Sequence, residues 1–245
     1  MRELPALLRA GDLLIVNDAA TLPASLPART ATGESIELRL LGPEAAGEFS
    51  AVVFGAGDYH VRTEDRPAPP RLRVGEHLQV GPQLTAPVLA CSALSPRLID
   101  LRFDLRDAEL WHALYAWGKP VQYAYRVEAL PLWSVQTAYA TRPWASEMPS
   151  AGKPISVEML LALAARNVGV ATLTHAAGLS ATGDPALDRV LPLPERYDLP
   201  EGTVQAIARV RAEGGASSQS EPAWCWRVRG RVRARCRDEA SRAYG

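Results

Sequence analysis

The chain has 245 residues, 47% of them apolar, and its 27 basic side chains balance 27 acidic ones. This length and apolar fraction are enough for one large domain or two smaller ones with a real core. The sequence has no run of 18 apolar residues and no signal peptide, which predicts a soluble, cytoplasmic protein without a membrane span. The three cysteines lack metal-site spacing, which argues against a structural zinc or a disulfide framework.

The beginning of the chain predicts a helix followed by a buried strand. Residues 4–8 are typical of a short helix that Gly11 ends, and residues 12–16 are a mostly apolar run. This strand delivers Asn17 and Asp18 at its carboxyl end. Polar side chains at a strand end suit a ligand-binding loop, and an Asx turn leading into the next domain is the alternative.

Between residues 24 and 104 the pattern changes to short stretches in which apolar and polar residues alternate. Glycine and proline separate these stretches, which is typical of a small antiparallel barrel. We therefore predict an inserted β-barrel domain over residues 24–104. The expected strands include residues 35–40, 51–54, 72–74, 77–80 and 98–103.

After residue 104 the apolar spacing becomes helical, and apolar strands and helices alternate again. Together with the first segment, this predicts an α/β fold in which residues 1–23 and 105–215 form one domain in two chain segments. The expected elements are a helix around residues 110–115 ended by Gly118, a helix over residues 157–166 with Ser156 as its N-cap, a strand over residues 168–174, and a helix that starts at Pro200 and ends at Gly214.

No general catalytic motif of high specificity is present, so the candidate sites are polar loops at strand ends and helix starts. In residues 146–156 a glycine and a lysine precede a helix N-terminus, where an anion or carboxylate is favoured; an ordinary capped loop is the alternative. His175 ends the strand over residues 168–174 among small residues. It is a candidate general base or polar contact, with a purely structural histidine as the alternative.

Taken in order, these stretches resemble one family, the S-adenosylmethionine:tRNA ribosyltransferase-isomerases of queuosine biosynthesis. Residues 11–24 are similar to that family's G-D-L-L-V-x-N-[DN]-[ST]-R-V-[IL]-P-A, and residues 136–140 to its Q-T-V-Y-A. Residues 149–152 resemble its P-T-A-G, and residues 172–180 its T-L-H-V-G-x-G-T-F, with His175 on the family histidine. The resemblance runs from about residue 2 to residue 215 and includes a barrel inserted at the same place.

The resemblance implies transfer of the ribosyl part of S-adenosylmethionine to the 7-aminomethyl-7-deazaguanine base of a tRNA, with loss of adenine and methionine. S-adenosylmethionine is then a substrate, tRNA is the partner, and no metal is needed. Because the sulfonium acidifies the neighbouring C5′ proton, a general base is required, together with groups that hold the adenine and the carboxylate. By this resemblance His175 is the base or a ribose contact, and the substrate contacts are Asn17, Asp18, Gln136, Tyr139, Ser150, Gly152 and Lys153.

The ligand loops also depart from the family pattern. Ala20 and Ser25 replace two family arginines, and residues 153–155 replace a histidine-containing L-H-F. Two other interpretations therefore stand beside the first. One is a non-catalytic protein that keeps an S-adenosylmethionine or nucleoside pocket on the same scaffold, and the other is an enzyme with a different nucleoside or sulfonium donor.

Residues 216–245 form a basic tail that does not continue the pattern of the body. Its seven arginines stand against three acids, which is typical of an RNA-binding arm; a solvated disordered arm and a non-native end are the alternatives. The resembled family continues here with a buried strand and turn, and a one-base shift of suitable codons gives a similar reading. We therefore expect this tail to be read from a shifted frame and to be disordered, in a chain shortened at both ends.

Overall fold

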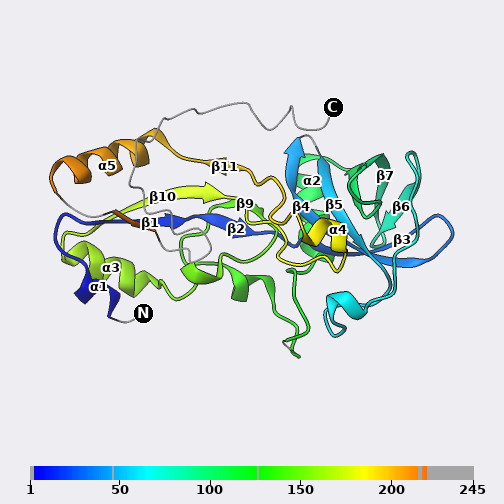
Figure 1. Cartoon of the computed structure of the whole chain (residues 1–245), viewed down its shortest axis with the longest axis horizontal. Coiled ribbons are helices and arrows are strands. Elements are labelled where there is room, and N and C mark those ends of the chain that lie inside the picture. The colour runs from blue at the N-terminus through cyan, green and yellow to red at the C-terminus, as the bar shows by residue number, and fades with distance from the viewer. Residues whose placement is uncertain (1–2, 46, 126, 215–216, 220–245) are drawn as a thin grey trace.

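The computed structural model describes residues 3–45, 47–125, 127–214 and 217–219. It is elongated, with an α/β body at one end and a β-barrel at the other (Figure 1). The body contains a four-stranded sheet in the order β11-β10-β1-β12, in which β1 runs parallel to β10 and β12 and β11 runs antiparallel to β10. Its elements are α1 (Leu4–Leu7), β1 (Leu13–Asn17), α3 (Val157–Ala165), β10 (Gly169–His175), β11 (Tyr197–Asp198), α5 (Glu201–Ala212) and β12 (Ser217–Gln219).

The central strand β1 is buried on both faces, which explains its continuous apolar sequence. Successive side chains of a strand point to opposite faces of the sheet. Leu14 and Val16 accordingly pack in one cluster with α3, and Leu13 and Ile15 pack in another with α5. Figure 1 shows the resulting layers, with α5 on one face of the sheet and α1 and α3 on the other. The predicted α/β class is therefore confirmed.

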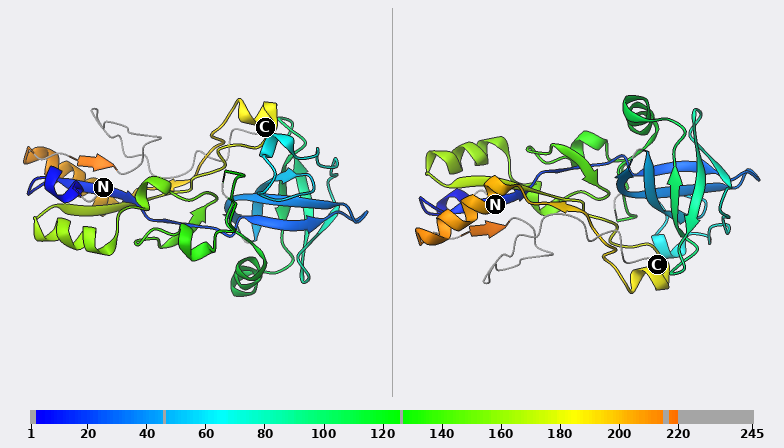
Figure 2. Two further views of the ribbon diagram at one scale, coloured as in Figure 1. Left: turned by 90° about the horizontal axis from the view of Figure 1, so that it is seen from below. Right: turned by 90° about the horizontal axis from the view of Figure 1, so that it is seen from above.

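The barrel is closed, with six antiparallel strands in the order β3-β4-β5-β8-β7-β6 and with β6 paired to β3. Its core includes Leu110, Ala113 and Leu114 of α2, so this helix packs on the barrel. In the described part of the chain none of these strands joins the sheet of the body, and Figure 2 shows the separation from two further sides. The elements are β3 (Ser25–Arg29), β4 (Ser35–Ala45), β5 (Glu48–Phe54), β6 (His77–Val80), β7 (Leu84–Cys91), β8 (Leu98–Arg102) and α2 (Asp107–Trp117).

The inserted antiparallel barrel is thus confirmed as a feature of the fold, whereas the domain limits at residues 24 and 104 stay predictions. One expected strand is wrong, because residues 72–74 are irregular and turn at Gly75 into β6. Two strands that the alternation did not predict, β3 and β7, contain Pro27 and Pro87. Proline cannot donate a ladder hydrogen bond, so it argues against a strand in a sequence although both strands form here.

Gly118 ends α2 as predicted, and close packing explains why this residue is glycine. A Cβ atom added there would lie 2.3 Å from the carbonyl oxygen of Pro23, a distance that no side chain tolerates. The helix end therefore sits directly against the chain segment that enters the barrel. Lys119, the next residue, exchanges two backbone hydrogen bonds of 2.9 Å with Ser25 at the start of β3.

Body and barrel are joined by a two-stranded parallel sheet and by a short helix that lies on the barrel. The sheet consists of β2 (Ala19–Thr21) and β9 (Arg142–Ala145), and β2 continues the line of β1 towards the barrel (Figure 1). The helix α4 (Pro185–Asp188) places Leu187 in a cluster with barrel residues of β5 and β8. Its N-cap, Asp184, also accepts a hydrogen bond of 2.7 Å from the hydroxyl group of Ser95.

Three residues of the tail are part of the sheet, although we expected the whole tail to be disordered. Ser217–Gln219 form β12 and pair in parallel with β1, because the second edge of that strand offers unpaired backbone groups. The rest of the tail, residues 220–245, lies outside the described residues, and so do Cys225 and Cys236. The shifted reading frame stays a prediction.

Within the described residues, no helix has the length and apolar character needed to cross a membrane. The same part of the chain has no group of three or more histidine, cysteine, aspartate or glutamate side chains that could hold a metal ion.

Candidate functional site

Asn17 joins the carboxyl ends of the neighbouring parallel strands β1 and β10. Its Oδ1 accepts hydrogen bonds from the backbone N–H groups of Ala19, at 3.0 Å, and His175, at 2.9 Å, and its Nδ2 donates to the carbonyl oxygen of His175 at 3.0 Å. The residue is only 4% exposed. Because paired groups replace the hydration that burial removes, this amide fixes the position of the His175 backbone relative to β1.

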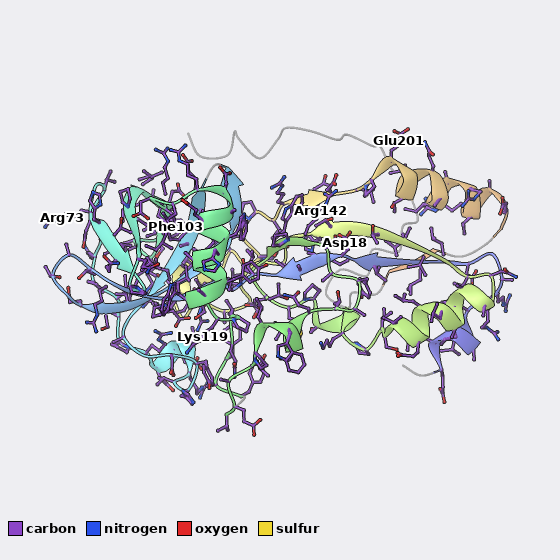
Figure 3. The ribbon with its side chains drawn as sticks, turned by 180° about the vertical axis from the view of Figure 1, so that it is seen from behind. Asp18, Arg73, Phe103, Lys119, Arg142 and Glu201 are labelled. Atoms are coloured by element: carbon purple, nitrogen blue, oxygen red, sulfur yellow. The ribbon has the colours of Figure 1, made fainter. Side chains whose placement is uncertain are left out.

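Asp18, the next residue, is a buried carboxylate that two threonine hydroxyl groups satisfy. Thr174 donates to its Oδ1 at 2.6 Å and Thr141 donates to its Oδ2 at 3.0 Å. The backbone N–H of Arg142 contacts the Asp18 carbonyl oxygen at 3.4 Å, and Figure 3 labels both residues beside the end of β1. The structure therefore brings Asn17, Asp18 and His175 to one edge of the sheet, where the neighbouring parallel strands β1 and β10 end.

The imidazole of His175 is held by a carboxylate that sequence reasoning missed. Its Nε2 lies 2.8 Å from Oε2 of Glu195, and the two side chains are 23% and 16% exposed. The other carboxylate oxygen, Oε1, accepts a hydrogen bond of 2.7 Å from the backbone N–H of Gly178. Glu195 stands in an irregular segment between α4 and β11 without periodicity, so no pattern in the sequence could have pointed to it.

Gln136 binds the backbone of β2. Its Oε1 accepts from the N–H of Thr21 and its Nε2 donates to the carbonyl oxygen of Thr21, both at 2.8 Å. The ammonium group of Lys153 donates to the backbone carbonyl oxygen of Gln136 at 2.7 Å. These contacts link Lys153 through Gln136 to the end of β2.

Lys153 does not lie at the helix start where the sequence predicted it. Helix α3 begins at Val157, with the Ser156 hydroxyl capping the N–H of Met159 at 3.3 Å, and Lys153 follows a separate 3₁₀ turn, η3 (Ser150–Gly152). Lys153 itself keeps helical backbone angles, but Pro154 has no backbone N–H to continue the turn, and residues 154–156 separate the two elements. Ser150 is exposed at the beginning of this turn.

Gly152 and Tyr139 fit against each other. The Tyr139 hydroxyl donates to the Gly152 carbonyl oxygen at 3.2 Å, and a Cβ atom on Gly152 would lie 2.2 Å from that hydroxyl oxygen. The Tyr139 ring packs on the apolar cluster of β1 and α3. Glycine at position 152 is therefore required by the tyrosine, and the predicted ligand contacts of both residues stay predictions.

A second polar cluster ties the loop after His175 to the barrel side of the molecule. Glu147 accepts hydrogen bonds from the hydroxyl of Tyr123 and from the N–H of Ser180, the latter at 2.7 Å. Burial, and then the neighbouring carboxylate of Glu147, raise the pKa of Tyr123 above its ordinary range, so the phenol stays a hydrogen-bond donor. The guanidinium of Arg39 lies 5.1 Å from the Tyr123 ring.

Two buried hydroxyl groups in the same region, Thr137 Oγ1 and Ser146 Oγ, have no hydrogen-bond partner among the described residues. Buried polar atoms of this kind are rare in folded proteins, and a bound ligand or an ordered water commonly satisfies them. Thr137 adjoins Gln136, and the Ser146 N–H donates to the Ala177 carbonyl oxygen at 2.8 Å, next to the loop that follows His175. Both belong to the segments that carry the predicted substrate contacts.

Comparison with known proteins shows to which family the chain belongs. A family model described as queuosine biosynthesis protein matches residues 1–218. The S-adenosylmethionine:tRNA ribosyltransferase-isomerase of Thermus thermophilus is 31% identical over 222 residues, which cover 87% of this chain and 60% of that protein. The protein of the same name from Gloeobacter violaceus is 34% identical over 218 residues, covering 87% of this chain and 57% of the relative.

The chain thus spans about three fifths of the length of these relatives. Among solved structures, the S-adenosylmethionine tRNA ribosyltransferase of Thermotoga maritima matches with 21% identity and a TM-score of 0.30, over 89% of this chain and 54% of that one. This global similarity is too low to compare positions between the two molecules. The family model and the sequence identities establish that the chain belongs to the queuosine biosynthesis protein family.

Proposed function

We propose that the protein binds S-adenosylmethionine at the strand ends of β1 and β10 and transfers its ribosyl part to a 7-aminomethyl-7-deazaguanine base in tRNA. Adenine and methionine leave, and epoxyqueuosine forms in the tRNA. Family membership and the name of the relatives, S-adenosylmethionine:tRNA ribosyltransferase-isomerase, support this reaction. The observation that carries it within the molecule is the half-buried His175, held at the end of β10 by Asn17 and Glu195.

His175 is the general base in this proposal. The reaction begins with removal of a proton from C5′, next to the sulfonium, and an imidazole is the side chain best matched to proton transfer near neutral pH. At 23% exposure its side chain is partly shielded and still open to a substrate. Asn17 binds the backbone of His175 and so fixes the position from which the imidazole side chain extends. Proton transfer requires such positioning.

The remaining predicted contacts divide by their chemistry. Lys153 and Ser150 are suited to the methionyl carboxylate, because an ammonium has three donors and only one of them is needed for the carbonyl oxygen of Gln136. Tyr139 offers a ring for stacking, and Gln136 and Asp18 offer polar contacts to the adenosine. No metal is required for these steps. Since the acceptor is tRNA, we place the reaction in the cytoplasm.

Two observations favour a second function, binding of S-adenosylmethionine or a nucleoside without catalysis. The side chains of Asn17, Asp18 and Gln136 make their described hydrogen bonds within the protein. In addition, Ser25 stands where the family has an arginine, and its hydroxyl donates to Glu37 in the barrel at 2.7 Å. A scaffold with these internal contacts can keep a pocket after the catalytic contacts have been lost.

Two measurements on the full chain separate these functions. Isothermal titration with S-adenosylmethionine tests binding, and chromatography of released adenine tests transfer with modified tRNA, with unmodified tRNA and without tRNA. We expect saturable heat and adenine release that depends on the modified base. Heat without adenine would establish the non-catalytic function, and the absence of both would refute S-adenosylmethionine as the donor.

A further inference from the structure

Two arginine side chains lie against the ring of Trp144, close to the candidate site. The guanidinium carbon of Arg196 is 3.7 Å from the centroid of that ring, and the guanidinium carbon of Arg142 is 5.4 Å from it. Trp144 and Arg142 belong to β9, and Arg196 directly precedes β11. Both arginines are exposed and the tryptophan is half-buried. We call these three side chains the arginine–tryptophan stack, and it lies on the surface of the protein.

The stack lies between the candidate site and the barrel. On one side, the carbonyl oxygen of Arg196 accepts a hydrogen bond of 2.8 Å from the backbone N–H of Ala176, the residue after His175. On the other side, a Cβ atom added to Gly42 of the barrel strand β4 would lie 3.1 Å from the carbonyl oxygen of Trp144. Figure 1 shows β9 at this junction of body and barrel. A ligand that extends from the site towards the barrel therefore passes the stack.

The two arginines differ in their charge partners. Arg142 pairs with the carboxylate of Asp198 in β11. Within the described part of the chain, the guanidinium of Arg196 has no carboxylate partner and donates no hydrogen bond, and the neighbouring carboxylate of Glu195 lies against His175 instead. Two guanidinium groups and one carboxylate leave a net charge of +1, and this charge is on Arg196.

The contact with the indole ring prepares Arg196 for a particular kind of ligand. A guanidinium group has five N–H donors in a planar fork that matches the oxygens of a phosphate group. When the plane of the group lies on an aromatic face, its N–H edges stay available for an acceptor. The ring also restricts the long side chain, so less conformational entropy is lost when a ligand binds. An exposed guanidinium that is held in this way, without a counter-charge, suits a phosphate.

We propose that Arg196, held by Trp144, binds a backbone phosphate of the tRNA close to the nucleotide that enters the candidate site. RNA as the source of the phosphate rests on the proposed function, in which the other substrate, S-adenosylmethionine, has no phosphate group. Each nucleotide of RNA brings a negatively charged phosphate, and contacts to phosphates position a nucleic acid without reading its bases. Arg196 adds the cation that the candidate site otherwise lacks on this side of His175.

Binding of RNA without any reaction gives the first readout. The full-length protein is titrated into fluorescently labelled, unmodified tRNA without S-adenosylmethionine, and anisotropy is followed between about 50 and 300 mM salt. We expect Arg196→Ala to weaken binding about 10-fold at low salt and to reduce the slope of log affinity against log salt by about 1, because one phosphate contact is lost. Arg196→Lys keeps the charge but not the planar fork, so it should keep the slope and lose only part of the affinity.

Arg73→Ala is the matched control. Arg73 is also an exposed arginine, and Figure 3 labels it in the barrel, away from Arg142 and the end of β1. Its replacement removes the same charge from the protein as Arg196→Ala does. We expect neither the affinity for tRNA nor the salt slope to change.

Adenine release with S-adenosylmethionine and modified tRNA gives the second readout. A phosphate contact remote from the reacting atoms is the same in the ground state and in the transition state. Arg196→Ala should therefore raise KM for the tRNA about 10-fold and leave the maximal rate within about twofold. The affinity for S-adenosylmethionine, measured by isothermal titration, should stay unchanged.

The two readouts separate this proposal from the proposed function. If the wild type binds tRNA with a salt slope that depends on Arg196 but releases no adenine, the proposed function is refuted and the phosphate contact stands. If the wild type releases adenine and Arg196→Ala keeps the wild-type slope and KM, the proposal is overturned and Arg196 serves only as a surface cation on Trp144. Equal losses in Arg196→Ala and Arg73→Ala, or no binding of tRNA by the wild type, also overturn it.

Discussion

The barrel and the end of the sheet both hold charged side chains, but they hold them in opposite ways. In the barrel, Glu37 binds the guanidinium groups of Arg39 and Arg66, and these side chains are only 7%, 2% and 1% exposed. At the sheet end, the side chains of His175 and Glu195 are 23% and 16% exposed. The Glu37 cluster is closed to solvent, whereas the pair of His175 and Glu195 is partly exposed.

The buried group in the barrel also has many contacts. Arg66 also donates to the carbonyl oxygens of Gly55 and Gly57, and Arg39 lies 4.2 Å from the ring centroid of Phe54. Burial alone would raise the pKa of Glu37, but the charges of Arg39 and Arg66 outweigh it and hold the pKa below its ordinary value. Full burial and many partners thus mark a structural charge cluster, whereas partial exposure marks a candidate for chemistry.

The largest expected effect is on the barrel. Glu37→Gln leaves two buried guanidinium groups without a counter-charge, and breaking a buried pair in this way costs about 3–5 kcal/mol of unfolding free energy. Urea unfolding followed by fluorescence measures this loss. A cost below about 1 kcal/mol is the size expected of exposed pairs, and it would show that the buried cluster does not stabilise the barrel more than such a pair does.

The same variant carries a pH dependence with a defined sign. Because the pKa of Glu37 is lowered in the folded state, its stabilisation is fully present above the unfolded value of about 4.3 and is lost as pH falls through the folded value. The difference in unfolding free energy between wild type and Glu37→Gln should therefore be constant from about pH 5 to pH 8 and shrink below about pH 4. A difference that grows on acidification contradicts this account.

The next effect concerns the hydrogen bonds by which Asn17 joins the ends of β1 and β10. Asn17→Ala leaves the backbone N–H groups of Ala19 and His175 without their acceptor, which should cost about 1–3 kcal/mol of unfolding free energy. Adenine release should fall more than this loss of folded protein explains, because His175 shifts. Gln79→Ala is the control, since the Gln79 side chain also bonds the backbone, at the carbonyl oxygens of Gly81 and Leu84, but lies exposed in the barrel. Equal losses of stability and of adenine release in the two variants would show that Asn17 has no special role at the sheet end.

Lys153→Ala tests a smaller contribution at the predicted carboxylate contact. Loss of a charge-assisted hydrogen bond should weaken S-adenosylmethionine binding by about 1–3 kcal/mol in isothermal titration, with the unfolding free energy almost unchanged. The bond to the Gln136 carbonyl oxygen is exposed and adds little to stability. Unchanged affinity would remove Lys153 from the site.

The smallest effect is expected for an exposed ion pair. Arg102 and Glu48 pair on the barrel with side chains 45% and 37% exposed, and Arg102→Ala should cost between about 0 and 1 kcal/mol of unfolding free energy. Urea unfolding in low and high salt measures it, and salt should erase the difference. A cost comparable to that of Glu37→Gln would show that burial does not separate the two kinds of pair.

The sequence predicts the two neighbouring central strands of the body well. Residues 12–16 correspond to β1, which is buried along its whole length, and residues 168–174 correspond to β10, which is more exposed but has the same largely apolar sequence. The sequence also predicted Asn17, Asp18 and His175 at strand ends, and the parallel pairing of β1 and β10 in the structure brings these ends to one edge. The prolines of β3 and β7 concealed two barrel strands, since proline is a poor member of a hydrogen-bonded ladder.

What could not be predicted depends on contacts between distant segments. Alternation puts Ile36, Leu38 and Leu40 in the barrel core and so puts Glu37 and Arg39 on its outer face. These two side chains are buried only because other segments cover that face, as the contacts of Arg39 with the Tyr123 ring and of Glu37 with Arg66 record. Glu195 likewise reaches His175 from an irregular segment, and no local pattern anticipates such a pair.

The most direct test of the central claim is adenine release by His175→Asn, compared with its affinity for S-adenosylmethionine. If His175 at the end of β10 is the base, the rate with saturating S-adenosylmethionine and modified tRNA should fall about 10²- to 10⁴-fold. Affinity measured by isothermal titration should stay within about threefold, because the lost interaction acts in the transition state. A rate equal to that of the wild type at unchanged affinity would contradict the account.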